Sequence, residues 1–477
     1  MEKTDFLNGS IAKSLIKFAI PLMLSLFLQA LYGAVDLIIV GQFGSTASVS
    51  AVGTGSQLMA GLTTIILGIS TGNTILIANK VGMRDNEGAS RSIIATTKIL
   101  SVITLVILVL VITFAEGVAT ILKAPSEAFD LTVSYIRICT IGLIFVAGYN
   151  LVASIYRGIG NSLSPLIFVA VACVVNIVGD LALVAGLKME ATGAAIATVV
   201  AQAMSMIFAF IYLKFSKVPF KIKKCDIIKS RSVVPVLKLG GPIATQDFLT
   251  SISFLVITSF VNNLGLESSA AIGIVEKLFV FLSIVSMSFM SGLSAFVAQN
   301  IGANNKDRAN KSLKVALMIS FACGVVIFLF ACFGGKYLCM IFEKNQAVII
   351  KARDYLWGTS FEYLLIAIVF CLLGYFNGRG KTAFVMAQGL STAFLVRVPL
   401  TYVFANMENP QMHIIGLAVS ISAFVSLLLS ISYYIFLRIK DKKNDKLEKS
   451  NQDMDNESEI IGTYEANDLA KINQANE

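Results

Sequence analysis

Long apolar segments with almost no charge recur along this chain and limit what it can fold into. In the whole stretch between Lys17 and Lys80, the only charged residue is Asp36. Of the 477 residues, 56% are hydrophobic and only 14% are charged, which is far less charge than a soluble protein carries. Apolar runs of about 20 residues are long enough to cross a hydrocarbon core of about 30 Å. The sequence therefore predicts an all-α polytopic membrane protein.

Twelve membrane-spanning helices are predicted from these runs, and the loops between them alternate in charge. Loops 80–92, 214–238 and 300–314 are rich in Lys and Arg, whereas loop 43–50 carries no charge. Because basic loops stay on the cytoplasmic side, we expect a multi-pass protein of the plasma or inner membrane with both termini in the cytoplasm. This arrangement explains the net charge of +9 without a nucleic-acid partner. The predicted spans are 15–42, 51–79, 93–115, 131–156, 163–186, 191–213, 236–262, 269–299, 312–333, 352–376, 383–405 and 412–437.

The two halves of the chain resemble each other at a nearly constant offset. IANKVG at 77–82 is echoed by VAQNIG at 297–302, and RGIGNS at 157–162 is echoed by NGRGKT at 377–382, at one and the same spacing. Each repeat holds six spans, so both halves insert with the same orientation. Parallel repeats of this kind are typical of a two-bundle transporter with a central cavity.

The duplication predicts a division of the chain into four parts. The two six-helix bundles are called the N-lobe and the C-lobe below. The last part is rich in Asp, Glu, Asn and Lys, and we expect it to be disordered or a loose surface helix. The parts are an N-lobe (1–213), a cytoplasmic linker (214–235), a C-lobe (236–437) and a charged cytoplasmic tail (438–477).

Asp36 is the most informative single residue, because a carboxylate in hydrocarbon is costly and usually marks an ion or proton path. Asn176 and Asp180 of the fifth span are one helical turn apart and share one helix face. Thr198 lies in the sixth span. Counted along spans of alternating direction at about 1.5 Å per residue, these side chains share one depth. We therefore expect them to converge in the outer half of the N-lobe.

Such a set of oxygen atoms suits two kinds of coupling ion. Two carboxylates, an amide oxygen and a hydroxyl fit a hard cation such as Na⁺. Two close carboxylates also repel each other, which suits a shared proton equally well. The alternative is a polar network that only holds helices together, but such a network would more naturally recur in both halves. The corresponding residues of the second half are the apolar Ile257, Val396 and Leu400.

Five more residues inside the spans are candidates for supporting roles. Tyr32, one turn before the first-span aspartate, either hydrogen-bonds to it or packs as an ordinary aromatic residue. Pro21 is predicted to kink the first span, and Asn150 of the fourth span is polar but lies nearer the inner side. In the second half, Glu276 and Arg397 are expected to form a structural ion pair, with substrate contact as the alternative.

At this point the chain resembles the MATE (multidrug and toxic compound extrusion) family over about residues 14–437. The likeness rests on IPL in the first span and its aspartate, on NIVGD at 176–180, on GAAIATVVAQ at 193–202 and on RGIGN after the fourth span. It implies a MATE fold and export of amphipathic, often cationic drugs or dyes by antiport with Na⁺ or H⁺ through alternating access. By resemblance, roles in coupling or gating pass to Asp36, Asn176, Asp180, Thr198, Tyr32 and Pro21.

One branch of that family carries further coupling carboxylates in the C-lobe. Here Asp247 and Glu362 lie in the corresponding spans but not clearly at matching positions, which favours the N-lobe site. A lipid-linked oligosaccharide flippase of the same superfamily is the alternative function, and it would need a more cationic cavity. A membrane-embedded enzyme is a third possibility without a supporting motif. We expect no enzyme activity and no cofactor, with drug-like molecules and the bilayer as partners and a monomer as the working form.

Overall fold

The computed structural model describes residues 4–216, 218–220 and 233–475, and these residues fold into helices joined by short turns. Twelve of the helical stretches are long and apolar enough to cross a membrane, as the sequence predicted. Helices suit this setting because a spanning segment must satisfy its backbone hydrogen bonds internally. Pro21 and Pro242 each lie inside a helix that continues through them.

The first six spans form the N-lobe. The fourth span includes the short 3₁₀ turn η1, and the fifth ends in the π-helical turn η2. The elements are α1 (Ile11–Phe43), α2 (Thr46–Gly82), α3 (Asn86–Thr113), α4 (Ala115–Ile121), η1 (Ser126–Ala128), α5 (Phe129–Gly158), α6 (Leu163–Asp180), η2 (Leu181–Gly186) and α7 (Glu190–Phe215).

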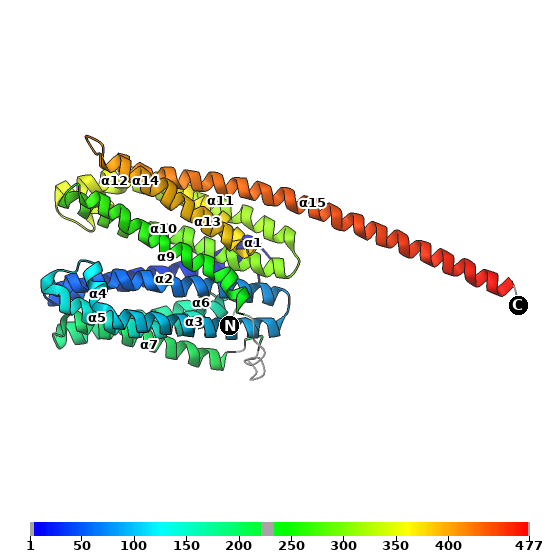
Figure 1. Ribbon diagram of the computed structural model, residues 1–477, viewed down its shortest axis with the longest axis horizontal. Helices are drawn as coiled ribbons and strands as arrows, with labels where there is room; N and C mark the ends of the chain where they lie inside the picture. Colours follow the sequence, from blue (N-terminus) through cyan, green and yellow to red (C-terminus); the bar gives the residue numbers. More distant parts are fainter. Residues whose placement is uncertain (1–3, 217, 221–232, 476–477) are drawn as a thin grey trace. The chain divides into compact units, whose positions relative to one another are not determined.

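The last six spans form the C-lobe, in which the eleventh span is interrupted by a second π-helical turn, η3. Figure 1 shows the blue-to-green helices of the N-lobe as one bundle and α9 to α14 as another. The elements are α9 (Val234–Asn262), α10 (Leu266–Gly302), α11 (Lys306–Met340), α12 (Gln346–Gly378), α13 (Thr382–Thr392), η3 (Ala393–Arg397), α14 (Val398–Ala405) and α15 (Met412–Ala475).

One compact unit contains the chain up to Leu427, which includes both lobes except the last part of the twelfth span, and the chain from Leu428 onward is a separate unit. The tail, predicted to be disordered or a loose helix, is helical, since α15 continues to Ala475. Residues 438–477 contain many Lys and Glu and no proline, a composition that favours the helical one of the two expected forms. The predicted linker 214–235 lies mostly outside the described residues.

The backbone turns repeat between the two lobes at the offset seen in the sequence. Arg84 and Asn304 occupy corresponding positions of the repeat, and both have φ of 57°. Gly160 and Gly380, related by the same offset, have φ of 85° and 71°, a region that favours glycine. The duplication is therefore present in the backbone as well as in the sequence.

The helices that follow the first of these turns begin with corresponding caps. Asp85 accepts a hydrogen bond from Gly88 N at 2.8 Å, and Lys80 Nζ lies 2.9 Å from the same carboxylate. Asn305 accepts from Arg308 N at 3.2 Å in the second lobe. Both caps satisfy backbone donors that a helix start leaves unpaired.

The two lobes meet where α2 lies against α9 and α10. At the ends of α2 and α10 the contact is reciprocal. Gly82 faces the carbonyl of Gln299, and Gly302 faces the carbonyl of Asn79, with no room for a Cβ at either glycine. The end of the unit where α1 begins and α2, α5 and α10 end is called the N-terminal face below. The lobes are thus closed against each other at the N-terminal face.

Residues 4–9, called the N-terminal segment below, run across this closed face. Thr4 N donates to the carbonyl of Gly160 in the N-lobe at 3.2 Å. The buried ring of Phe6 packs at 5.3 Å from the ring of Phe18 and at 5.1 Å from that of Phe296 of the C-lobe. The segment therefore touches both lobes.

Arg308 of α11 holds the N-terminal segment from the C-lobe side. Its Nε, Nη1 and Nη2 donate to the carbonyls of Phe6, Gly9 and Asn8, each at 2.9 Å. Asn300 of α10 adds a bond from Nδ2 to the carbonyl of Phe6 at 3.0 Å. The planar fork of one guanidinium thus fixes three carbonyls of the segment to the C-lobe.

Candidate functional site

The two intramembrane aspartates of the N-lobe meet where α1 packs against α6. Asp36 is 6% exposed, and Asp180, the last residue of α6, is fully buried. Their carboxylates are close enough to repel each other electrostatically. The structure thus buries both side chains at the contact of α1 with α6, and their role as a site stays a prediction.

Asn176 and Thr198 complete the group, which is called the N-lobe polar cluster below. Asn176, one turn before Asp180 on α6, is 1% exposed. Its Nδ2 donates to Thr198 Oγ1 of α7 at 3.4 Å, a long hydrogen bond. This bond orients the amide and leaves its oxygen as an available acceptor. Three helices, α1, α6 and α7, thus contribute to one buried polar site.

Four buried acceptor oxygens of this cluster have no hydrogen-bond donor among the described residues. They are Oδ1 of Asp36, both carboxylate oxygens of Asp180 and Oδ1 of Asn176. Buried polar atoms are nearly always paired, so a group of unpaired acceptors needs an explanation. A cation or a proton would satisfy them, because both bind to oxygen acceptors. The donor set therefore fits either coupling ion.

Local backbone geometry also singles out this point of the chain. The π-helical turn η2 starts directly after Asp180. Such turns are rare and frequently lie at functional sites, because the extra residue re-aims the side chains beside it. Nothing in the periodicity of the fifth span predicted this change of winding.

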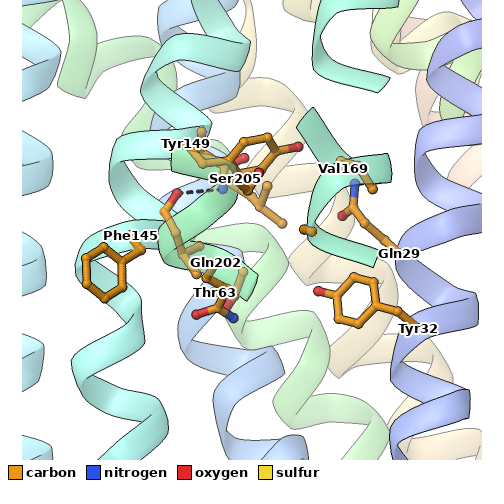
Figure 2. A pocket seen from close by; sticks show the side chains of 12 residues that line it. Gln29, Tyr32, Thr63, Phe145, Tyr149, Val169, Gln202 and Ser205 are labelled. Atoms are coloured by element: carbon orange, nitrogen blue, oxygen red, sulfur yellow. Dashed lines mark hydrogen bonds between the residues drawn. The ribbon is translucent and has the colours of Figure 1, made fainter. Parts of the chain in front are cut away.

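A small cavity lies in the N-lobe next to the polar cluster. Its volume is about 100 Å³, and its lining comes from α1, α2, α5, α6 and α7. Figure 2 shows the Tyr32 hydroxyl pointing into it from α1, with Gln202 of α7 on another wall. Such a volume holds a few water molecules and is too small for a drug-sized ligand. The cavity reaches Tyr32, which lies one helical turn before Asp36.

The three supporting residues of the N-lobe fall at different places. Tyr32 and Asn150 both line the cavity. Asn150 Nδ2 donates to the carbonyl of Val146 at 2.9 Å within α5. The described hydrogen bonds include none between Tyr32 and Asp36, so Tyr32 acts here as a cavity wall. Pro21 lies in the half of α1 that packs on the C-lobe, and a kink there stays a prediction.

The charged residues of the C-lobe pair differently from the sequence-based expectation. Arg397 Nη2 lies 3.4 Å from Glu362 Oε1 of α12, with side chains 13% and 4% exposed. Glu276 instead accepts a hydrogen bond from Thr258 Oγ1 at 3.0 Å. The expected pair of Glu276 with Arg397 was therefore wrong, because depth along a span does not tell which way a side chain points around the helix. Glu276, Glu362 and Arg397 are called the C-lobe charged cluster below.

Sequence reasoning missed two glutamines of the N-lobe cavity. Gln29 lies one turn before Tyr32, so Gln29, Tyr32 and Asp36 follow one face of α1. That spacing was a readable signal. Gln202 of α7 follows Thr198 by one turn, and its buried Oε1 has no donor among the described residues. The polar cluster and the cavity thus share a continuous polar path along α1 and α7.

Solved structures identify the fold. A multidrug resistance MATE family transporter of the MOP superfamily, in an outward-facing conformation, matches with a TM-score of 0.86 at 19% identity, covering 93% of this chain and 99% of that chain. A MOP superfamily transporter from Pyrococcus furiosus, for which the reverse polarity of its binding pocket suggests a different function, matches with a TM-score of 0.85 at 18% identity, covering 92% and 98%. The fold is therefore that of a polytopic MATE-type transporter.

Sequence comparison adds the family itself. The family model MatE matches residues 21–182 and 242–403, so the two matched ranges begin at Pro21 and Pro242, one repeat apart. The chain belongs to the MatE family, which comprises transporters and not enzymes.

Two bacterial relatives match most of the chain. The probable multidrug resistance protein YpnP of Bacillus subtilis is 26% identical over 444 residues, covering 93% of this chain and 99% of the relative. The multidrug export protein MepA of Staphylococcus haemolyticus is 26% identical over 415 residues, covering 84% and 89%.

Proposed function

We propose that this protein exports amphipathic, often cationic drugs in exchange for Na⁺ or H⁺, and that the N-lobe polar cluster holds the coupling ion. The names of two relatives, a multidrug resistance protein and a multidrug export protein, support the class of substrate. The observation that carries the coupling site is the set of four buried oxygens in this cluster without a donor. A cation or proton that enters the site gives these oxygen atoms the positively charged partner that they lack.

In this mechanism the ion neutralises negative charge in the N-lobe polar cluster. Two carboxylates buried together repel each other, and each isolated buried charge costs several kcal/mol. Binding of a cation or proton between Asp36 and Asp180 removes that cost, so the helices that carry them pack closely only in the ion-loaded form. Ion release separates the charges again and favours a rearranged α1.

Helix α1 is suited to pass this change to the C-lobe. Its second half carries Asp36 against α6, and its first half packs on α10, where the rings of Phe27 and Phe281 lie 6.0 Å apart. Drug and ion then exchange because each favours a different arrangement of the lobes. The basic loops support a cytoplasmic N-terminal face, so the closed lobes correspond to a conformation shut toward the cytoplasm.

The composition of the cavity favours drug export over a lipid-linked oligosaccharide flippase. A flippase would need positive charge to hold pyrophosphate. None of the residues that line the N-lobe cavity is Arg or Lys. The cavity must widen during transport, because a drug needs about 300 Å³ or more.

The test is dye efflux from vesicles under an imposed Na⁺ gradient and, separately, an imposed pH gradient. We expect Asp36→Asn to lose roughly tenfold or more in the gradient-driven rate, because one of the two charges that the ion neutralises is gone. Asp247→Asn is the matched control, since it makes the same change at a carboxylate of α9 in the C-lobe. Full gradient-driven efflux by Asp36→Asn, or an equal loss in both variants, sinks the proposal.

A further inference from the structure

The C-lobe charged cluster lies at the place in its bundle that corresponds to the N-lobe polar cluster. Tyr135 of α5 and Tyr355 of α12 occupy corresponding positions of the repeat, and both are buried. Tyr135 interacts electrostatically with Asp36 and Asp180, and Tyr355 interacts with all three members of the C-lobe charged cluster. Two corresponding tyrosines thus mark the same position in each lobe.

The two π-helical turns also lie at this corresponding position of the two lobes. Both lie in the fifth span of their repeat, η2 directly after Asp180 and η3 ending at Arg397. At the offset that relates the two tyrosines, Arg397 corresponds to Ile177, the neighbour of Asn176. The guanidinium therefore comes from the same stretch of helix that supplies the polar side chains of the N-lobe site.

The two clusters differ in how their acceptor atoms are satisfied. In the N-lobe, four oxygens lack a donor. In the C-lobe, none of the donor-less buried oxygens of the described residues belongs to Glu276 or Glu362. Arg397 provides the positive charge there, with Nη2 at 3.4 Å from Glu362 and its guanidinium 5.1 Å from the centre of the Phe254 ring. Stacking on an aromatic face further stabilises a buried guanidinium.

We propose that Arg397 is a tethered cation that takes, in the C-lobe, the place that the transported ion takes in the N-lobe. An arginine stays protonated in proteins and cannot leave its chain, so the C-lobe carboxylates bind no exchangeable ion. The comparison between lobes rests on the proposed coupling site, but the occupancy of the C-lobe site is measurable by itself. A chain without this guanidinium has an unpaired buried carboxylate at Glu362, which recruits Na⁺ or H⁺ to avoid a bare charge.

The experiment counts cations bound by the purified full-length protein in lipid nanodiscs. One arm measures equilibrium binding of radioactive sodium, and a parallel arm measures the protons taken up on acidification. In this comparison the parent and its Arg397 variants carry Asp36→Asn, so the C-lobe result stays readable if the N-lobe proposal is wrong. We expect Arg397→Gln to bind one cation more per chain than its parent, in one arm or the other. Arg397→Lys keeps a tethered charge and should gain none.

The identity of the new site is checked by adding Glu362→Gln to Arg397→Gln, which should abolish the gained cation. A folded Arg397→Gln protein with unchanged uptake overturns the proposal and leaves an ion pair that only stabilises the fold. A gain that survives Glu362→Gln overturns it as well, because the cation then binds elsewhere.

If the single variant misfolds, the double variant Glu362→Gln/Arg397→Gln in the otherwise unchanged protein replaces it, because it removes both charges of the Glu362–Arg397 pair together. It should fold and bind as many cations as the unchanged protein. Fewer bound cations would mean that the Glu362–Arg397 pair itself exchanges an ion, which refutes the proposal.

Discussion

Replacing Arg308 by Ala should open the N-terminal face of this transporter. The side chain donates three hydrogen bonds to carbonyls of the N-terminal segment, all at 2.9 Å, and its guanidinium lies 5.4 Å from the centre of the Phe296 ring. The segment itself is bonded to Gly160 of the N-lobe. These contacts join the two lobes only while they are closed at this face. Their loss therefore weakens the closed state and leaves the open state unchanged.

The size of the effect follows from the contacts. Hydrogen bonds from a charged donor contribute about 1.5–3 kcal/mol each when buried. None of the three bonds is fully buried, so about 0.7–1 kcal/mol each is the appropriate value, or about 2–3 kcal/mol for the fork. Since about 1.4 kcal/mol is a factor of ten, the ratio of closed to open molecules should fall roughly 30- to 150-fold.

Pulsed electron–electron double resonance measures the ratio of closed to open molecules directly. Spin labels at Met83 and Asp307, both exposed beside the turns of the two lobes, report the distance across the N-terminal face. Arg308→Ala should move population from the short to the long distance. Lys311→Ala is the control, because it removes the same charge from an exposed position of α11 one turn away. If the Arg308→Ala and Lys311→Ala distance distributions coincide, the N-terminal segment does not hold the lobes closed.

Two further predictions concern the turns of the repeat. Gly302→Ala should also populate the open distance, because a methyl group has no room at the contact with α2, whereas Gly273→Ala faces open space in the same helix and should not. Equal distributions for the two variants would contradict the close contact. Hydrogen bonds from Gly88 N and Lys80 lower the pKa of Asp85 below its ordinary value of 3.8. A lowered folded-state pKa means that Asp85 stabilises the fold above that ordinary value and loses this effect as the pH falls through the folded value. The gap in Tm between the unchanged protein and Asp85→Asn in detergent should therefore shrink below about pH 4, and a gap that stays constant down to about pH 3 speaks against it.

Sequence reasoning could predict the parts of the fold that the hydrocarbon core of the membrane determines. Hydrocarbon demands long apolar helices, so twelve spans and their order were readable. The convergence of Asp36 with Asp180 was also readable, because depth follows from counting residues at a fixed rise. Asn176 and Asp180 share a face for the same reason of helical spacing. The role of these residues stays a prediction.

The remaining features depend on rotation about each helix axis, which counting does not give. Glu362, rather than Glu276, faces Arg397, and the π-helical turn η3 that ends at Arg397 shifts its direction further. The hydrogen bonds of Arg308 to the N-terminal segment join residues that lie about 300 positions apart in the sequence, so no local sequence pattern predicts them. The sequence also did not predict Gln202 as a cavity residue, because a single polar residue in a span has many possible neighbours.

The reciprocal contact of Gly82 and Gly302 has the form of an isologous interface, the kind that two identical subunits make about a twofold axis. A homodimer of one six-helix repeat would carry every residue twice, so a carboxylate introduced for ion binding would appear in both subunits. When the two copies are joined in one chain, a residue in one copy can change without the same change in the other. One copy keeps Asp36 while the other has Ile257 in its place, so the molecule combines a symmetric contact between its lobes with asymmetric chemistry.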